Sequence, residues 1–342
     1  MRLIFSRSLI LAATVLLAAC LPTTARVAPE TTHLTWPPEP EPARVSYVRS
    51  FSRAEDLGIS RGIFERVKDL IFGEAEQRLV RPMAVAVVDG VIYVADPGAH
   101  GVHRFDSKGQ GYALIGAPQG APLPSPVGLA RGAAGEVYVA DSALARIFVI
   151  RPGAKAAEPV ALQATLHQPT GLAYDATSGR LFVTDTTAHD IKVFNRAGAL
   201  ENTIGKRGTA PGEFNFPTLL WRTPQGHLHV TDSLNFRVQT LDEKGHVLGS
   251  FGRQGDGGGD SSRPKGIATD RYEHLYVVDS LFHSVQIFDT AGRYLLSIGG
   301  RGRGPGEFWL PTGIFIDSDD TIYIADSYNR RVQVLRYVGG AA

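Results

Sequence analysis

A short pattern of residues recurs six times from Arg81 onward, and this repeat limits the possible folds more than any other feature of the chain. Each copy contains an apolar run that closes on an aspartate, and successive aspartates lie 44 to 47 residues apart. The aspartates are Asp96, Asp141, Asp185, Asp232, Asp279 and Asp326. A proline opens each copy 14 to 16 residues earlier, at Pro82, Pro126, Pro169, Pro217, Pro264 and Pro311. The constant order predicts one structural unit built six times.

Each unit has the composition of β-strands. Short runs of Val, Ile, Leu, Tyr and Phe are bounded by Gly, Pro, Asp and Ser. Neither face of the run 322–325 (Ile-Tyr-Ile-Ala) is polar, which indicates a strand covered on both sides, as in sheets stacked face to face. A fourth run ends the full copies, for example at residues 247–252 and 294–299. Four strands in about 45 residues is the pattern of one propeller blade.

Four motifs in these copies resemble NHL repeats. They are Pro-x-Gly-Ile/Leu-Ala, Ile-Tyr-Val-Ala-Asp-Ser, Asn-x-Arg-Val-Gln-Val and the linker Gly-x-Gly-Pro-Gly-Glu-Phe, which occurs at 302–308 and in a looser form at 208–214. The resemblance covers residues 81–338, and copies two and three depart most from it. It implies an all-β fold, a six-bladed β-propeller with four-stranded blades.

The ends of the repeat region indicate how the ring closes. The sixth copy has no fourth apolar run, whereas the segment Arg44–Phe51 ends in the same Ser-Phe pair as the fourth run of copy four at Ser250-Phe251. We expect residues 44–59 to form a closing strand and loop, with the strand completing blade six and removing the open sheet edges.

The N-terminal residues have the pattern of an export signal. Arg2 and Arg7 precede the apolar run 9–17, which is too short to span a membrane, and Ala18-Ala19-Cys20 follows. Small residues before a cysteine resemble a bacterial lipobox, so residues 1–19 are interpreted as a lipoprotein signal peptide and Cys20 as the lipid attachment site. An ordinary signal peptide with a chance cysteine is the alternative. Leu21, in place of an aspartate, favours the outer membrane.

These features predict an outer membrane lipoprotein of a Gram-negative cell envelope, facing the periplasm and held to the membrane through the lipid on Cys20. Residues 20–43 include the proline-rich stretch 37–42 and are expected to form an extended tether. The sole cysteine leaves no intramolecular disulfide. Without residues 1–19 the chain has 33 basic and 34 acidic residues, so neither charge nor location favours nucleic acid as a partner.

One amphipathic helix is predicted at residues 60–73, N-terminal to the repeats. Ser60 can cap its start and Gly73 can end it, and the apolar residues fall on one side. Docking on its own domain is the preferred interpretation. Contact with a partner or with a membrane surface are the alternatives, and a membrane-lying helix would carry more Lys and Arg.

Two sets of polar residues in the repeats are candidate metal ligands. The six repeated aspartates are better explained as turn residues that accept backbone hydrogen bonds, because equivalent turns spread around a ring and do not converge. His100, His189 and His283 lie four residues after three of these aspartates. Three histidines can hold zinc, but these turns lie at least one strand outside the innermost strand. No metal site, cofactor or catalytic residue is predicted.

The proteins with repeats of this kind include a zinc lyase, and its metal-binding positions can be compared directly with this sequence. In the peptidylglycine amidating lyase the metal histidines directly follow the opening proline. The matching positions here are Met83, Val127, Thr170, Thr218, Lys265 and Thr312, with no His, Asp or Glu among them. That activity is therefore not supported, and a hydrolase or lyase at the channel mouth remains as the alternative by analogy of fold alone.

The preferred function is a binding or scaffold module for an envelope protein, peptide or glycan, built as a monomeric ring. The face that carries the opening prolines and the second-to-third strand turns is the expected binding face. Its candidate residues are Arg81, Arg263, Lys265, His100, Asn235, Phe236, Phe282, His283, Tyr328 and Asn329. The aromatic residues could anchor a partner, or they could pack on neighbouring turns.

Overall fold

The computed structural model describes residues 34–59, 77–109 and 111–339. The chain divides into two units, Met1–Thr32 and His33–Ala342, and the fold described here is that of the second unit. The predicted signal peptide, Cys20, most of the predicted tether and the predicted helix at 60–73 lie outside the described residues.

Six antiparallel sheets make up the described chain. Blade one comprises β3 (Ala84–Val88), β4 (Val91–Asp96), β5 (Gly101–Asp106) and β6 (Gly111–Ile115). Blade two comprises β7 (Pro126–Arg131), β8 (Val137–Asp141), β9 (Arg146–Ile150) and the two-residue β10 (Glu158–Pro159). Blade three comprises β11 (Pro169–Asp175), β12 (Arg180–Asp185), β13 (Asp190–Phe194) and β14 (Leu200–Ile204).

The remaining blades follow the same order. Blade four comprises β15 (Pro217–Arg222), β16 (Leu228–Asp232), β17 (Arg237–Leu241) and β18 (Val247–Phe251). Blade five comprises β19 (Pro264–Thr269), β20 (Leu275–Asp279), β21 (Ser284–Phe288) and β22 (Tyr294–Gly299). Blade six takes β23 (Ile314–Ile316), β24 (Thr321–Asp326) and β25 (Arg331–Tyr337) from the last repeat. The predicted all-β propeller with six four-stranded blades is confirmed.

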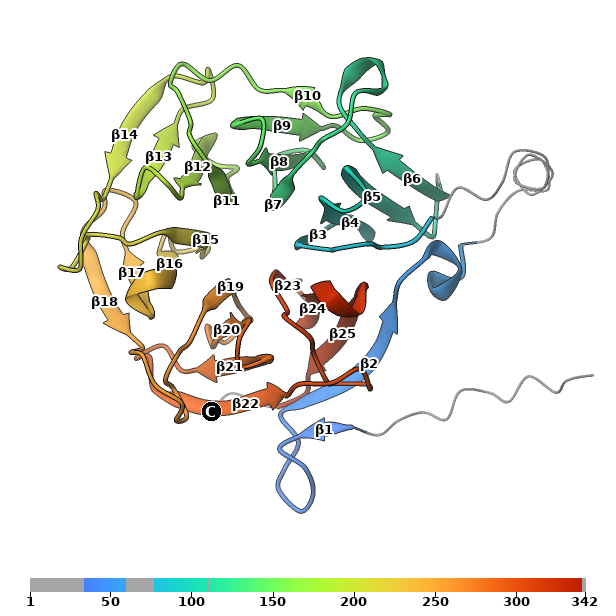
Figure 1. Ribbon diagram of the computed structural model, residues 1–342, viewed down its shortest axis with the longest axis vertical. Helices are drawn as coiled ribbons and strands as arrows, with labels where there is room; N and C mark the ends of the chain where they lie inside the picture. The colour runs from blue at the N-terminus through green and yellow to red at the C-terminus, as the bar shows by residue number, and fades with distance from the viewer. Residues whose placement is uncertain (1–33, 60–76, 110, 340–342) are drawn as a thin grey trace, which may run out of the picture. The chain divides into compact units, whose positions relative to one another are not determined.

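The first strands of the blades form the inside of the ring. Contacts join β3 to β7, β7 to β11, β11 to β15, β15 to β19, β19 to β23 and β23 back to β3, so the circle is complete. All six first strands face the centre (Figure 1). Each blade buries apolar side chains against the next one. Tyr276 and Val278 of blade five, for example, share a core with Ile322 and Ile324 of blade six, which explains the absence of a polar face on these strands.

An N-terminal strand closes the ring, as predicted. β2 (Val45–Phe51) pairs antiparallel with β25, with Val45 opposite Tyr337 and Phe51 opposite Val332. Figure 1 shows β2 alongside β25, the first and last strands of the ring meeting in one blade. The Phe51 ring also meets Phe105 of blade one edge to face at 5.4 Å. A further short strand, β1 (Thr35–Trp36), pairs with β2, so the chain already belongs to the sheet at Thr35.

The glycine of the Pro-x-Gly motif allows the inner strands to approach closely. A Cβ added to Gly171 would lie 2.6 Å from the Thr218 carbonyl oxygen of the next blade, and one added to Gly266 would lie 2.5 Å from that of Thr312. Such distances are shorter than any real contact, so a larger residue would force the blades apart. The motif is therefore explained by packing between blades.

A hydroxyl group tethers each pair of neighbouring blades, with one exception. The residue after the repeated aspartate donates a hydrogen bond to the carbonyl of the proline that opens the next blade. The pairs are Ser142 to Pro169 at 2.6 Å, Thr186 to Pro217 at 2.7 Å, Ser233 to Pro264 at 2.6 Å, Ser280 to Pro311 at 2.5 Å, and Ser327 to Pro82. In blade one this position is Pro97, which has no hydroxyl to donate.

The described residues contain four short 3-10 helices and no α-helix. These are η1 (Ala54–Leu57), η2 (Pro118–Gly120), η3 (Ser233–Asn235) and η4 (Ser327–Asn329). Within the same residues, no helix has the length and apolar character needed to cross a lipid bilayer.

Candidate functional site

The opening prolines and the turns between second and third strands lie on one face of the ring. Antiparallel pairing sets Pro217 opposite Asp232 and Pro264 opposite Asp279, so the start of each first strand meets the end of each second strand. We call this side the proline face. It is the binding face predicted from the sequence.

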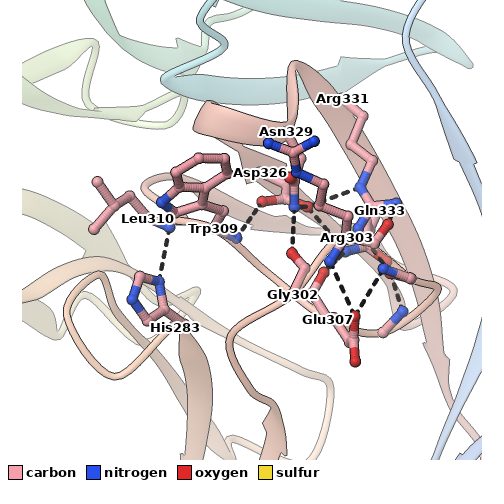
Figure 2. A network of polar contacts seen from close by, with 12 residues as sticks. His283, Gly302, Arg303, Glu307, Trp309, Leu310, Asp326, Asn329, Arg331 and Gln333 are labelled. Atoms are coloured by element: carbon pink, nitrogen blue, oxygen red, sulfur yellow. Dashed lines mark hydrogen bonds and ion pairs between the residues drawn. The ribbon is translucent and has the colours of Figure 1, made fainter.

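Much of the motif chemistry on the proline face holds turns in place. The Asp326 Oδ2 accepts hydrogen bonds from the Asn329 amide at 2.9 Å, the Arg331 guanidinium at 2.8 Å and the Gln333 amide at 3.1 Å (Figure 2). The same three side chains reach backbone carbonyls of the linker 302–307. Asn235, Arg237 and Gln239 repeat the arrangement around Asp232. Asn235 and Asn329 therefore serve the fold, although they lie on the proline face.

The repeated aspartates act as the predicted turn residues. Asp96 accepts hydrogen bonds from the backbone N–H groups of Val80, Arg81, Gly98 and Ala99. Burial alone would raise the pKa of Asp96, but the His103 ring, whose Nε2 atom lies 3.4 Å from Oδ2, and the backbone hydrogen bonds outweigh it, so the pKa lies below its usual range. Such a carboxylate is ionised and fully engaged in joining two strands.

Two of the three repeated histidines bind the next blade. The Nδ1 atoms of His189 and His283 lie 3.1 Å and 3.0 Å from the backbone nitrogens of Phe216 and Leu310, whose N–H groups donate to them. Burial and the nearby Arg301 lower the pKa of His283, which favours the neutral ring that such an acceptor requires. Each histidine is thus used at a separate blade seam. His100 occupies the matching turn of blade one and is exposed. No group of three potential metal ligands occurs among the described residues.

The residues directly after the opening prolines line a cavity at the centre of the proline face. Its volume is about 200 Å³. The lining residues are Met83, Val127, Thr170, Thr218, Lys265 and Thr312, one from each blade, together with Ser125, Ser142, Gln168 and Leu219. We call this cavity the channel mouth. Among the residues that the structure describes, Lys265 is its sole charged side chain, and no carboxylate lines it.

Some polar side chains of the channel mouth already form hydrogen bonds within the protein, and others do not. Thr170 donates to the Thr218 carbonyl at 2.8 Å, Thr312 donates to the Met83 carbonyl at 3.0 Å, and the Thr218 hydroxyl is bonded to Ser233 at 2.9 Å. The Ser142 hydroxyl bonds Pro169 at the blade seam. These hydroxyls stabilise the ring and are not free to turn toward a ligand without loss of a structural bond.

Lys265, Gln168 and Ser125 form the second group. Their side chains have no hydrogen-bond or ion-pair partner in the described part of the chain. Burial lowers the pKa of the Lys265 ammonium, and repulsion from Arg263 lowers it further. Arg263 and Arg81 are exposed, with their backbone N–H groups bonded to Asp279 and Asp96. Lys265 therefore gives the channel mouth a basic character.

Further out on the proline face, three large apolar side chains are exposed at matching turns. Leu234, Leu281 and Tyr328 each lie two residues after a repeated aspartate, in blades four, five and six, and their exposed fractions are 38%, 49% and 55%. We call these three residues the apolar arc. Trp309 lies beside it, with its ring 5.9 Å from that of Tyr328, and the Arg303 guanidinium lies 5.0 Å from the Trp309 ring.

The three aromatic residues predicted for the binding face differ in their exposure to solvent. Tyr328 is exposed, whereas Phe236 and Phe282 are half-buried. Leu234 and Leu281 are not among the binding residues predicted from the sequence. Counting residues from each aspartate would have found them, since they share the position of Tyr328.

Comparison with known proteins supports the repeat and the fold. An NHL repeat matches residues 166–194, and a family model described as a 6-bladed beta-propeller matches residues 267–337. No curated protein matches the sequence significantly.

Many solved structures share the fold at low sequence identity. Virginiamycin B lyase from Staphylococcus aureus is 17% identical, with a TM-score of 0.56, over 76% of this chain and 96% of the lyase chain. An auxiliary nutrient binding protein from Bacteroides ovatus is 14% identical, with a TM-score of 0.58, over 75% of this chain and 69% of that one. A chain of a nidogen/laminin complex is 20% identical, with a TM-score of 0.52, over 72% of this chain and 86% of that one. At these identities the likeness concerns the fold alone.

Proposed function

We propose that this protein is a lipid-anchored binding module of the bacterial cell envelope, which holds a partner protein on its proline face through the apolar arc. The observation that carries the proposal is the exposure of Leu234, Leu281 and Tyr328 at matching turns of three consecutive blades. These side chains are already partly buried, so covering the exposed part of each is worth about 1 kcal/mol, and the three together provide the core of an interface.

The surroundings of the apolar arc favour a rigid interface. Asp326 fixes the turn that carries Tyr328 through the Asn329, Arg331 and Gln333 bonds, and Asp232 does the same for Leu234. Turns held in this way lose little conformational freedom when a partner binds. Arg303 and Trp309 supply the polar rim and the aromatic group that interfaces commonly use.

The membrane anchor rests on the sequence. The basic residues, the apolar run and Ala18-Ala19-Cys20 indicate lipidation of Cys20, and Leu21 favours the outer membrane. Residues 37–42 lie in the turn between the paired strands β1 and β2, so they do not form the extended stem that the sequence predicts. The part of the predicted tether that precedes β1 would then link the ring to the lipid on Cys20 and present it to the periplasm.

An enzymatic role has less support from the site. Lys265 is the one titratable side chain that lines the channel mouth within the described ranges, whereas acid–base chemistry commonly pairs two groups of different pKa. The structural relatives include both a lyase and a nutrient binding protein, which shows that the fold hosts either kind of function.

Site-specific photocrosslinking in intact cells tests this function. A photoreactive phenylalanine analogue replaces Leu281 or Tyr328 of the full chain, and Leu200 serves as the matched control because it is 41% exposed on the outer strand β14. We expect one discrete adduct from positions 281 and 328 and none from position 200. Adducts of equal yield from all three positions, or no adduct from the arc, would contradict the proposal.

A Cys20→Ser version of the Tyr328 crosslinking variant tests the anchor separately. We expect it to lose metabolic labelling by fatty acid, to leave the membrane fraction and to give a weaker adduct. Full labelling after the substitution would exclude Cys20 as the attachment site, even if the adduct at position 328 persists.

A further inference from the structure

We infer that the channel mouth is a binding site for a carboxylate, with Lys265 as its counter-ion. This site is separate from the apolar arc and does not depend on the partner proposed above. Three features of the cavity support this inference: its unpaired hydrogen-bond donors, its charge and its size.

The unpaired groups of the channel mouth can all donate hydrogen bonds. The Lys265 ammonium is donor-only, the Gln168 amide has two donor hydrogens, and the Ser125 hydroxyl has one. None of the three has a partner within residues 34–59, 77–109 and 111–339, whereas the threonine hydroxyls around them are bonded to the protein. A ligand that accepts several hydrogen bonds would satisfy this set, and a carboxylate has about four acceptor sites.

The charge of the cavity has the complementary sign. Withdrawing an ammonium from water is costly unless an anion accompanies it, and in the described part of the chain no carboxylate lines the channel mouth. The charge of a bound anion would offset both the desolvation of the Lys265 ammonium and its repulsion by Arg263. A charge-assisted hydrogen bond to the ammonium is about twice as strong as a neutral one.

The small volume and the apolar walls of the cavity favour a small ligand with a single negative charge. About 200 Å³ lies below the usual range of about 300–1,000 Å³ for sites that take drug-sized molecules. Met83, Val127 and Leu219 offer contacts to a short carbon chain. With one lysine inside the cavity, a carboxylate is neutralised and a phosphate dianion is not. The carboxylate could belong to a free short-chain acid or to the C-terminus of a peptide, and both would place the same group beside Lys265.

Titration calorimetry at constant ionic strength tests the site, with the full chain carrying Cys20→Ser. The probes are sodium butyrate, its neutral counterpart butyramide, trialanine, trialanine amide and inorganic phosphate. We expect saturable binding of butyrate or trialanine, with at least a tenfold preference over the matching amide and over phosphate. Binding of butyrate identifies a free acid as the source, and binding of trialanine alone identifies a peptide terminus.

Three variants complete the test. Lys265→Met should weaken carboxylate binding at least tenfold, while Lys244→Met, at an exposed turn between the third and fourth strands, should leave it unchanged. Gln168→Leu should weaken binding severalfold, and it provides the test if Lys265→Met does not fold. Equal binding by a carboxylate and its amide, unchanged affinity in both cavity variants, or no binding of either carboxylate would overturn the inference.

Discussion

At the scale of the residue, His229 shows how burial sets protonation. It lies on β16 with its Nδ1 atom 2.9 Å from the Thr240 hydroxyl. Burial lowers its pKa to about 4, with a smaller contribution from His227. The folded protein therefore favours neutral His229, whereas the unfolded chain takes up a proton near the ordinary pKa of about 6.5.

The consequence is a loss of stability in mild acid. Because the folded pKa is depressed, His229 costs no stability above pH 6.5 and progressively destabilises the fold as the pH falls toward 4, by up to roughly 3 kcal/mol. We expect the free energy of unfolding of His229→Gln to fall less over this range than that of the unchanged protein. Urea unfolding at pH 7, 5.5 and 4.5 measures the difference. His100→Asn, at an exposed turn, is the control, and identical pH slopes for all three proteins would contradict the assignment.

At the scale of the element, the seams between blades depend on glycines and hydroxyls that the repeat supplies. The Pro-x-Gly glycine, which occurs in blades two, three, five and six, allows strand contact, and the hydroxyl after the aspartate bonds the next proline. Blade one departs from this rule at Pro97, so the seam between blades one and two lacks the hydroxyl bond that the other five seams have.

Ser280→Ala tests the contribution of one seam. The Ser280 hydroxyl is buried and donates to the Pro311 carbonyl at 2.5 Å, so its removal should lower the free energy of unfolding by about 1–2 kcal/mol. Ser297→Ala, on the exposed side of β22, should change stability by less than about 0.5 kcal/mol. Chemical denaturation of both variants makes the comparison, and equal stabilities would show that the seam bond is not needed.

At the scale of the whole molecule, the ring is held shut by its N-terminal strand. β2 covers the edge of β25 and buries Val45 and Phe51, the latter against blade one. A sheet edge left open in this blade would expose unpaired backbone groups and the adjoining core.

Deleting residues 44–51 should therefore unfold or aggregate the ring. Loss of the Val45 and Phe51 burial alone is worth about 3–6 kcal/mol, which is comparable to the whole stability of many proteins, about 5–15 kcal/mol. Deletion of residues 21–32, which precede β1, should leave the unfolding transition in place. Size-exclusion chromatography and urea unfolding of both deletions decide the matter, and a monomeric cooperative ring without residues 44–51 would refute this role of β2.

The repeats alone predict the number of blades, their order and the strand that closes them, because a repeated unit must bury each copy against its neighbours. They also show which residues follow the opening prolines, and hence which would line the channel. Only the tertiary structure decided the use of each side chain. Asn329 and His283 bond to linker backbone, Lys265 has no partner among the described residues, and Leu281 is exposed. Burial and pairing depend on atoms brought together from different blades, and the local sequence of one repeat does not contain them.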